Sequence, residues 1–381
     1  MYASAINLVN FWTKSTVGIN SINIADLFLY VTAIAEAEGL VFFGISDLNV
    51  NTDAQRYRTW ITDARQGTMS WMTKNIEIRE NPKLLLPNAQ AVFSFGFPYF
   101  QGDHWKRPLN DSKPMIAQYA RLRDYHLFLR DKILRVQNKL ESVCSPGTAW
   151  RIAVDSAPVL ERAFAFKAGA GFIGKNTCFI HPQKGSFFLL AELFTTWAVI
   201  EEKSEKFSSH LTRSPSGGCG SCRRCQVHCP TGALDQDYRI DASKCISYWT
   251  IEHRGLIPLK YWKWVGHYMF GCDICQLVCP YNRGMTISPQ TEPLIRIKPG
   301  MDLMDIIHMD QDFYEKTFGG TPMTRAKISG LRRNALIAAV VKKDPRTHEA
   351  LERLITDPDD IVKGTAHQVT EFKKNFRGDL D

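Results

Sequence analysis

The sequence predicts a protein of mixed helix and sheet that is built from three regions. Helix-like and strand-like segments alternate through the first half of the chain. Eight of its ten cysteines then fall within residues 219–279. Beyond them, short amphipathic segments are separated by Asp-Pro turns. We therefore expect a chain of α+β and α/β character, with an α/β domain over residues 1–205, a cysteine-rich domain over residues 206–290 and a helical, HEAT-like domain over residues 291–381.

The N-terminal region opens with clear helix and strand patterns. An amphipathic segment runs from Asp26, a plausible N-cap, to Gly39, a residue that commonly stops a helix. The expected helix, two strands and long helix lie at residues 26–39, 41–48, 89–100 and 124–143. The long helix presents one apolar face, made of Leu129, Ile133, Val136 and Leu140.

The rest of the first half continues this alternation. Residues 151–199 are expected to form a strand, a turn, a helix, a glycine loop and two further strands. Residues 201–218 are polar and rich in Ser and Gly, which predicts a linker into the cysteine-rich domain.

Composition and charge limit the class of protein. The hydrophobic fraction of 44% and the charged fraction of 23% are ordinary for a globular protein, and no apolar run approaches the ~20 residues that span a bilayer. No secretory or twin-arginine signal is evident, so we expect a cytoplasmic protein without a membrane partner. The net charge of +8 favours an anionic partner without identifying it.

The cysteines are spaced as ligands of two iron–sulfur clusters. The first run is C-x2-C-x2-C-x3-C-P and the second is C-x2-C-x3-C-P. Three cysteines in a tight loop bind one cubane, and the cysteine before proline binds the other. We therefore assign one [4Fe–4S] cluster to Cys219, Cys222, Cys225 and Cys279. The second cluster is assigned to Cys229, Cys245, Cys272 and Cys275, which makes this a ferredoxin-like domain.

Cys245 stands apart from both runs and has a specific role in this assignment. It supplies the ligand that a regular second run would carry at position 269, where this chain has Met269. The alternative is a pair of zinc sites, but zinc usually takes two separated C-x2-C pairs. Cys144 and Cys178 are expected to be buried thiols, because a reducing compartment disfavours disulfides.

Two segments before the cysteines carry candidate chemistry. Asp155 follows an apolar strand and precedes a helix, so it is either that helix's N-cap or a general acid at the mouth of a pocket. Residues 169–176 are glycine-rich but follow a helix, which is the wrong order for a dinucleotide-binding loop. We expect this loop to approach a ligand, with Lys175 and Asn176 as polar contacts.

Cations and aromatic residues gather at three places. Ser247, Tyr248 and Trp249 follow Cys245 and would face anything bound near its cluster, with core packing as the alternative. The later helices carry Arg325, Lys327, Arg332, Arg333, Lys342, Lys343 and Arg346. A second basic group, interleaved with Tyr261, Trp262, Trp264 and Tyr268, consists of Lys260, Lys263 and His267. Such mixtures suit nucleic acid, although a solvated face is the simpler alternative.

Together these motifs resemble the epoxyqueuosine reductase family. The resemblance rests on VDSAPVLERAFAFKAGAGFIGKNT, GSFFLLAEL, CGSCRRCQVHCPTGAL, CISYWTIEHRG and GCDICQLVCPYNRG, and it covers roughly residues 25–370. It implies a cytoplasmic, cobalamin-dependent iron–sulfur enzyme related to reductive dehalogenases. Such an enzyme performs the last step of queuosine synthesis, in which the epoxide on the wobble base of tRNA is reduced to an alkene. The first ~20 residues have no counterpart in this comparison.

The resemblance also implies roles for individual residues. Asp155 matches the proton donor, and we expect burial to raise its pKa. Residues expected around the corrin are Arg79, Asp155, Lys175, Asn176 and Ser247. Residues expected to hold the anticodon stem–loop are Lys260, Lys263, Arg325, Arg332 and Arg333.

One departure concerns how cobalamin is held. Asp124, Tyr125 and His126 begin the D-x-H-x-x-G motif of many cobalamin proteins, but the glycine position is Leu129. The resemblance therefore implies base-off cobalamin without a histidine ligand.

We further expect an external electron donor and a monomer. The competing classes are a ferredoxin-type electron carrier, a respiratory reductive dehalogenase and a zinc-binding nucleic-acid module. Corrin uptake by an iron–sulfur protein would separate the reductase from the carrier and the zinc module.

Overall fold

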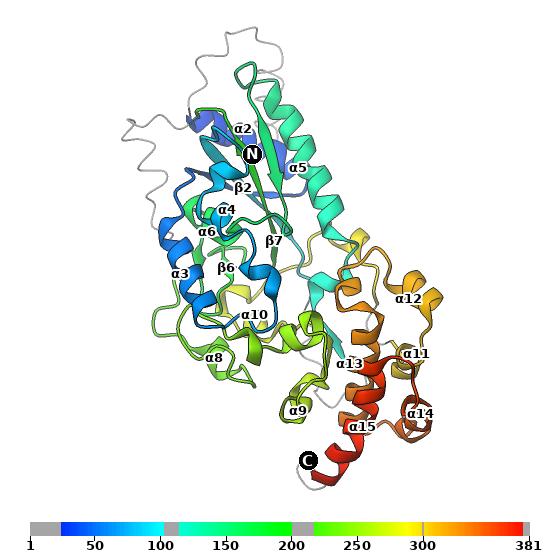
Figure 1. Ribbon diagram of the computed structural model, residues 1–381. Helices are drawn as coiled ribbons and strands as arrows, with labels where there is room; N and C mark the ends of the chain where they lie inside the picture. The colour runs from blue at the N-terminus through cyan, green and yellow to red at the C-terminus, as the bar shows by residue number, and fades with distance from the viewer. Residues whose placement is uncertain (1–23, 103–113, 200–216, 299–300, 376–381) are drawn as a thin grey trace.

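The protein is described here by a computed structural model, which defines residues 24–102, 114–199, 217–298 and 301–375. A four-stranded sheet with its helices lies at one end of the molecule, and the C-terminal helices lie at the other (Figure 1). The cysteine-rich segment lies between them. The first ~20 residues and nearly all of the expected linker fall outside the described residues.

The main sheet has the strand order β1-β2-β7-β4. Its three pairings are all antiparallel, so this domain is α+β rather than α/β. The strands are β1 (Val41–Ser46), β2 (Ala91–Pro98), β4 (Trp150–Ala153) and β7 (Phe188–Thr195). Two small two-stranded sheets pair β3 (Met115–Ile116) with β8 (Tyr268–Phe270), and β5 (Phe172–Ile173) with β6 (Phe179–Ile180).

Helices cover both faces of the main sheet. On one face α2 (Ile24–Ala37) and α5 (Tyr125–Glu141) pack over Phe93, Phe95 and Phe97 of β2. The predicted apolar face of α5 is confirmed, because its four residues are fully buried. Gly39 follows α2 with φ +71°, as a helix stop requires, but α2 begins at Ile24, so Asp26 lies in the first turn and is not the N-cap.

The opposite face carries the short helix α6 (Glu161–Lys167), which packs against β1, β2 and β7. Between β1 and α5 the described residues also form short helices. These are α3 (Asn51–Thr62), η2 (Ser70–Thr73), α4 (Ile76–Glu80), η3 (Pro82–Leu84) and η5 (Gln118–Arg121).

The cysteine-rich segment consists of short turns of helix separated by loops. Its elements before β8 are α8 (Arg224–Val227), η6 (Ala242–Lys244), η7 (Tyr248–Glu252), η8 (Leu259–Tyr261) and α9 (Trp262–Val265). After β8 come α10 (Ile274–Leu277) and η9 (Pro280–Asn282). Helices α8 and α10 pack against each other, which gives the segment an internal pairing of its two cysteine runs.

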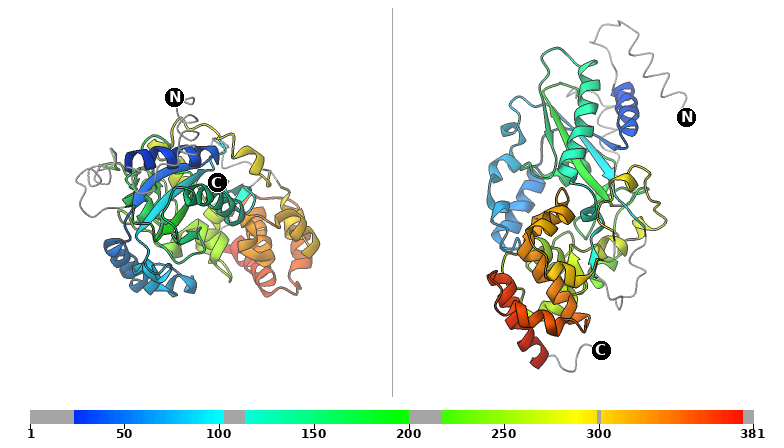
Figure 2. Two further views of the ribbon diagram at one scale, coloured as in Figure 1. Left: turned by 90° about the horizontal axis from the view of Figure 1, so that it is seen from above. Right: turned by 90° about the vertical axis from the view of Figure 1, so that its right-hand side faces the viewer.

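The C-terminal region is helical, as predicted. It contains η10 (Glu292–Leu294), α11 (Leu303–Ile307), α12 (Gln311–Phe318), η11 (Pro322–Ala326), α13 (Lys327–Val341), α14 (Thr347–Leu354) and α15 (Asp360–Asn375). Helix α13 lies at its centre and packs against α11 and α15 (Figure 2). Turns at the two Asp-Pro pairs separate α13 from α14 and α14 from α15. Among the described helices, none combines the length and apolar character that crossing a bilayer requires.

One hydrophobic core joins the cysteine-rich segment to these helices. It includes Trp249, Trp262 and Phe270 from the former, and Leu336 and Phe372 from the latter. The predicted boundary at residue 290 therefore does not separate two cores. Helix α13 and the segment around Cys245 pack into this same core.

Candidate functional site

The structure gathers the first predicted set of four thiols. Burial and the thiol of Cys219 raise the pKa of Cys225 to about 11, and Cys279 and Cys222 add to the shift. Such electrostatic effects require that the four sulfurs lie close together. Cys219 and Cys222 lie in the loop before α8, Cys225 lies in α8, and Cys279 lies between α10 and η9.

The second set is gathered in the same way. Burial, Cys245 and Cys229 all raise the pKa of the Cys272 thiol. A hydrogen bond with Cys178, followed by burial, raises the pKa of Cys275, and Cys272 and Cys245 contribute. Cys178 therefore lies beside this set and is only partly buried, whereas Cys144 is buried as predicted.

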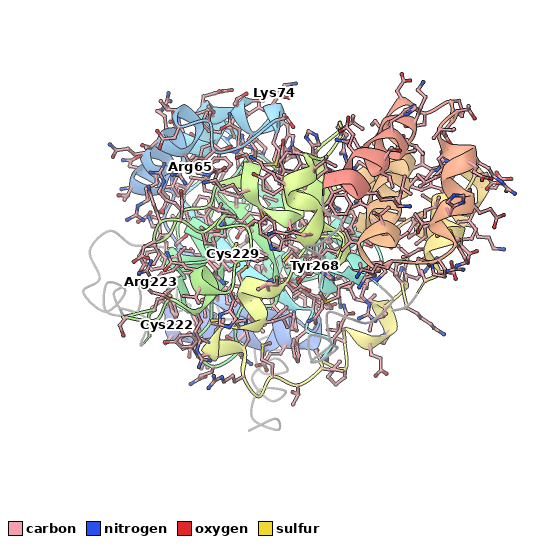
Figure 3. All side chains as sticks on the ribbon, turned by 90° about the horizontal axis from the view of Figure 1, so that it is seen from below. Arg65, Lys74, Cys222, Arg223, Cys229 and Tyr268 are labelled. Carbon is pink, nitrogen blue, oxygen red and sulfur yellow. The ribbon has the colours of Figure 1, made fainter. Side chains whose placement is uncertain are left out.

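All ten cysteines are free thiols. Within the described ranges, no three His, Cys, Asp or Glu side chains are close enough to bind a single metal ion. A cubane binds its cysteines through separate iron atoms, so its ligands need not converge on one point. Seen from below, Cys222 and Arg223 lie near the edge of the molecule, and Cys229 lies closer to its middle (Figure 3).

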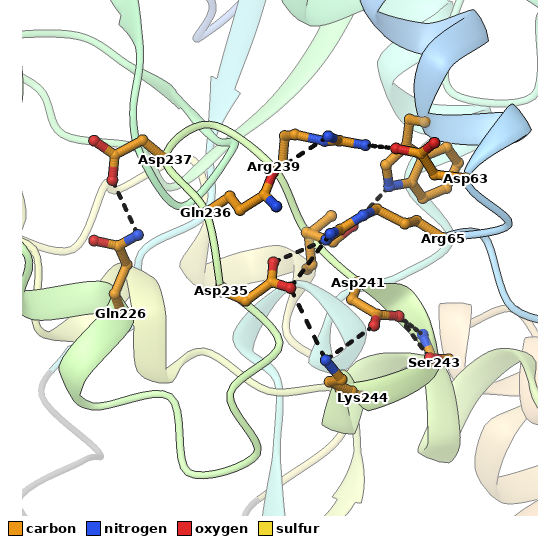
Figure 4. Close-up of polar contacts among 12 residues, drawn as sticks. Asp63, Arg65, Gln226, Asp235, Gln236, Asp237, Arg239, Asp241, Ser243 and Lys244 are labelled. Atoms are coloured by element: carbon orange, nitrogen blue, oxygen red, sulfur yellow. Dashed lines mark hydrogen bonds and ion pairs between the residues drawn. The ribbon is translucent and has the colours of Figure 1, made fainter.

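Ion pairs fix the loop between Cys229 and Cys245 onto the N-terminal domain. Arg65, which follows α3, forms an ion pair with Asp235 at 2.8 Å, and Arg239 reaches back to Asp63 (Figure 4). Backbone bonding reinforces the contact, because the Ala242 amide donates to the Arg65 carbonyl. The second set of thiols is thus tied to the domain that carries Asp155.

The glycine loop contacts the cysteines directly. The Lys175 amide donates to the Sγ of Cys219, and its ammonium group lies 3.1 Å from Asp237. The Asn176 side chain donates to the carbonyl of Cys275 at 3.1 Å. Both side chains are buried, so their polar groups support the two cysteine loops.

Arg79 and Ser247, which are also expected near a corrin, lie on different elements. Arg79 of α4 is buried, donates to the carbonyls of Lys74 and Asn75, and lies over the Tyr57 ring at 5.5 Å. Burial raises the pKa of the Cys245 thiol, although Ser247 forms a hydrogen bond with this thiol that lowers it.

Asp155 occupies a loop between β4 and α6 and has φ +50°, a left-handed conformation that few non-glycine residues adopt. It is not the N-cap of α6, because Leu160 holds that position without a side-chain cap. Its amide donates to Glu161, and its Oδ2 accepts hydrogen bonds from Tyr125 at 2.8 Å and from His126 at 2.9 Å. The loop thus presents its carboxylate to the start of α5.

These hydrogen bonds reverse the pKa direction expected from the sequence. Burial opposes ionisation of Asp155, but the bonds from His126 and Tyr125 outweigh it, and the pKa of Asp155 lies below its ordinary value. The bond to Asp155 raises the pKa of His126 to about 9, with help from Asp124, whose Oδ1 lies 2.7 Å from Nδ1. At neutral pH the pair is therefore imidazolium and carboxylate.

Two further carboxyl groups lie behind this loop. Burial and the Asp155 carboxylate raise the pKa of Glu161 to about 8. Glu192 of β7 is fully buried opposite Ala153, and neither of its oxygens has a hydrogen-bond partner among the described residues. Burial and Glu161 raise its pKa far above the ordinary value.

Arg325 faces Asp155 from the C-terminal region. Its guanidinium group binds Glu252 at 2.8 and 3.0 Å and lies over the Trp71 ring at 5.4 Å. The positive charge of Arg325 helps to lower the pKa of Asp155. The acid is therefore surrounded by residues from the N-terminal domain, the cysteine-rich segment and η11.

The predicted tRNA contacts fall into two groups. Lys260 and Lys263 lie on the surface over the rings of Tyr261 and Trp264, and Arg325 is also accessible. The sequence prediction is wrong for Arg332 and Arg333, which the structure turns inward. Arg332 donates to Asp357 and to the Ile307 carbonyl. Arg333 donates to the carbonyls of Trp249, His253 and Gly255.

Sequence reasoning did not connect Tyr125, His126 and Glu161 with Asp155. The signal for the first two was the Asp-Tyr-His motif, which was weighed only as a cobalt-binding motif. Glu161 lies six positions after Asp155, at the start of the helix that follows it, and its residue type alone gave no signal of this contact.

Two gathered sets of four thiols, in a chain that also holds a hydrogen-bonded acid, indicate an iron–sulfur redox protein. Family models agree with this class: the model described as "4Fe-4S double cluster binding domain" matches residues 218–282, and "Epoxyqueuosine reductase QueG, DUF1730" matches residues 79–156. The chain belongs to the epoxyqueuosine reductase family and is an oxidoreductase.

Curated relatives support this membership over most of the chain. An epoxyqueuosine reductase from Xanthomonas campestris is 33% identical over 85% of this chain and 89% of its own length. One from Cyclobacterium marinum is 34% identical over 80% of this chain and 94% of its own length. The Escherichia coli enzyme is 32% identical over 77% of this chain and 76% of its own length.

Solved structures extend the similarity to the whole fold. An epoxyqueuosine reductase bound to an epoxyqueuosine-modified tRNA-Tyr stem loop has a TM-score of 0.78 and 26% identity, and the match covers 92% of this chain and 91% of the other. The Bacillus subtilis enzyme matches equally well and was solved with a catalytic aspartate loop swung out of its active site.

Proposed function

We propose that this protein reduces epoxyqueuosine to queuosine at the wobble position of tRNA, the last step of queuosine biosynthesis. The observation that supports this most directly is the Asp155 loop, whose carboxylate is held by Tyr125 and His126 beside Arg325. Asp155 is proposed as the acid that protonates the departing epoxide oxygen. A mobile aspartate loop in a relative of known fold supports the same role.

Electrons for the reduction are proposed to come through two [4Fe–4S] clusters. Cys219, Cys222, Cys225 and Cys279 would hold one, and Cys229, Cys245, Cys272 and Cys275 would hold the other. Cys245 lies on the segment that leads through η7 to Glu252, the partner of Arg325. The second cluster is therefore the one proposed to lie nearer the reacting centre, with an external donor reducing the first.

The family implies base-off cobalamin, and the residues near Ser247 fit such a group. Gln66 Oε1 and Trp249 Nε1 are buried without a hydrogen-bond partner among the described residues. One accepts and the other donates, which suits the amide groups around a corrin. The Trp249 ring packs on Tyr248, whose hydroxyl accepts from the amide of Thr68, two residues after Gln66. We propose that this side of the site, with Arg79, Lys175, Asn176 and Ser247, holds the cofactor. When bound, cobalamin supplies the low-potential centre that reduces the epoxide.

The tRNA is proposed to lie across the cysteine-rich segment at η8 and α9 and the C-terminal region at η11. Lys260, Lys263 and Arg325 are the accessible cations for its backbone and bases, and Trp71 is an exposed aromatic beside Arg325. A positively charged surface of this kind would position the anticodon stem–loop with the modified base toward Asp155.

The proposal is tested by purifying the chain without oxygen and supplying cobalamin, a chemical reductant and tRNA that contains epoxyqueuosine. A base-off corrin spectrum together with conversion to queuosine, measured by mass spectrometry of the nucleosides, is expected. Iron–sulfur absorbance without corrin uptake or conversion would instead identify an electron carrier.

Asp155→Asn is predicted to lower turnover by about 10²- to 10⁴-fold, because general acid catalysis typically contributes that much. The variant should keep its iron content and corrin spectrum, since the cysteines are untouched. The exposed Asp131→Asn of α5 is the matched control and should retain full activity. Normal turnover by Asp155→Asn would remove this residue from the mechanism.

A further inference from the structure

In the function proposed so far, Tyr125 and His126 only hold the Asp155 carboxylate and Asp124 has no role, yet the three residues are consecutive and hydrogen-bonded to one another or to Asp155. Asp124 caps α5, and its Oδ1 lies 2.7 Å from His126 Nδ1. Tyr125 and His126 both bond to the same oxygen of Asp155. The result is a continuous chain of hydrogen bonds from Asp124 through His126 to Asp155.

The reaction itself needs more protons than one carboxyl group can hold. Converting an epoxide to an alkene breaks both carbon–oxygen bonds and releases the oxygen as water. The balanced change consumes two electrons and two protons. A single carboxyl group carries one proton at a time, so Asp155 must be protonated again within each turnover.

Asp155 is also poorly suited to store a proton by itself. Its carboxylate accepts two hydrogen bonds, and its pKa lies below the ordinary value. The imidazole of His126 has a pKa of about 9 and is therefore protonated at neutral pH. The proton in this pair is stored on the histidine.

We propose that Asp124, His126 and Asp155 form a proton relay that reloads the catalytic acid, a conclusion that rests on the proposed function. In this step the Nε2–H bond of His126 breaks and an O–H bond forms at Oδ2 of Asp155. The bonding pair stays on Nε2, and the Nδ1–H remains bonded to Asp124. Neutral His126, whose side chain is 37% exposed, then takes a proton from water.

Other ionisable groups face this pair from three neighbouring elements. Glu161 of α6 and Arg325 of η11 act electrostatically on Asp155, and Tyr119 of η5 packs against the Tyr125 ring. Burial raises the pKa of Tyr125 well above the ordinary value, so this hydroxyl stays a neutral donor. Of the groups facing Asp155, His126 is a titrating donor bonded directly to its carboxylate.

His126→Gln tests the relay, because glutamine keeps an N–H donor but cannot titrate. Turnover is expected to fall by about 10- to 100-fold. Small protonated bases such as imidazolium should restore it in proportion to their concentration, while leaving the wild-type rate unchanged. The exposed His348→Gln of α14 is the control and should behave as the wild type does. An unchanged pH–rate profile without buffer rescue would overturn the relay and leave His126 a structural residue.

Asp124→Asn gives a second and milder test. Asparagine preserves the cap of α5 but removes the negative charge behind Nδ1. The alkaline limb of the pH–rate profile, expected near pH 9 for the wild type, should move to lower pH. An unmoved limb would contradict a role for Asp124 in holding the proton.

The protonation state can be measured without turnover. Histidine ¹³C NMR of the oxidised holoprotein, with the His126 signal assigned from His126→Gln, should show titration near pH 9. Asp155→Asn should bring this titration back toward the ordinary value near 6.5. Titration of wild-type His126 at the ordinary value would overturn the relay even if the reductase activity is present. Titration of His126 near pH 9 in a protein that fails to convert epoxyqueuosine would instead overturn the proposed function.

Discussion

The two ends of the molecule bury polar side chains in opposite ways. On α13, Arg333 and Asn334 are fully buried, and their nitrogens donate to five backbone carbonyls of the segment 249–269. On β7, Glu192 is equally buried, yet neither of its oxygens has a partner among the described residues. Ser94, directly opposite on β2, is in the same situation.

Arg333 and Asn334 are structural polar groups, whereas burial of Glu192 favours binding of a proton. A buried group with complete hydrogen bonding fixes the packing of two elements, because any shift would leave several acceptors unpaired. A buried carboxyl group without partners favours its protonated form. Glu192 lies opposite Ala153, two residues before Asp155, so the unpaired group is adjacent to the proposed chemistry.

The largest effect in this comparison is expected for Arg333→Met. Removing the guanidinium group leaves the carbonyls of Trp249, His253 and Gly255 unpaired, so the loss should be about 3 kcal/mol or more of unfolding free energy. Urea unfolding monitored by circular dichroism measures it. The exposed Arg353→Met should change stability by less than about 0.5 kcal/mol. Equal stability of the two variants would show that the network contributes nothing to packing.

Glu192→Gln is expected to have a smaller effect and the opposite sign at neutral pH. Folding raises the pKa of Glu192, so between the ordinary value of 4.5 and the higher folded value the native state binds more protons than the unfolded chain. Stability therefore falls as pH rises through this window. The amide should raise the unfolding free energy by about 1 kcal/mol near pH 8, and by less near pH 5. A gain independent of pH would show that Glu192 does not titrate.

Ser94→Ala should have the smallest effect. Its hydroxyl has no partner among the described residues, so its removal should change the unfolding free energy by less than about 0.5 kcal/mol. Ser329→Ala, which removes a donor to Asp359, should cost about 1 kcal/mol by comparison. Urea unfolding distinguishes the two, and a large loss at Ser94 would reveal a hydrogen bond to internal water.

Features that follow from short sequence patterns could be predicted. The apolar face of α5 follows from the helical repeat, and the two sets of thiols follow from spacing within short loops, with Met269 accounting for the displaced Cys245. The helix face depends on residues three or four positions apart, and the thiol sets follow from two short cysteine runs whose pairing is a known pattern. The helical C-terminal region was recognisable for the same reason, since Asp-Pro pairs end its segments.

Features that depend on tertiary packing were not predictable. The cation run on α13 gave no sign that Arg333 points inward, because charge alone does not report burial. The pKa of Asp155 was expected to rise through burial, but the side chain is 54% exposed, and hydrogen bonds from a helix 30 residues away lower the pKa. Alternation of helix and strand likewise left open whether the sheet would be parallel or antiparallel.

Because the cysteine-rich segment and α13 share one core, the cysteine-rich segment can complete its packing only after α13 has been synthesised. Trp249 and Thr250, close to Cys245, complete their backbone bonding only with Arg333 and Asn334, which are translated more than eighty residues later. The segment that carries Cys245 therefore cannot reach its final packing until α13 has left the ribosome. A chain that terminates before α13 would therefore leave the core beside Cys245 incomplete.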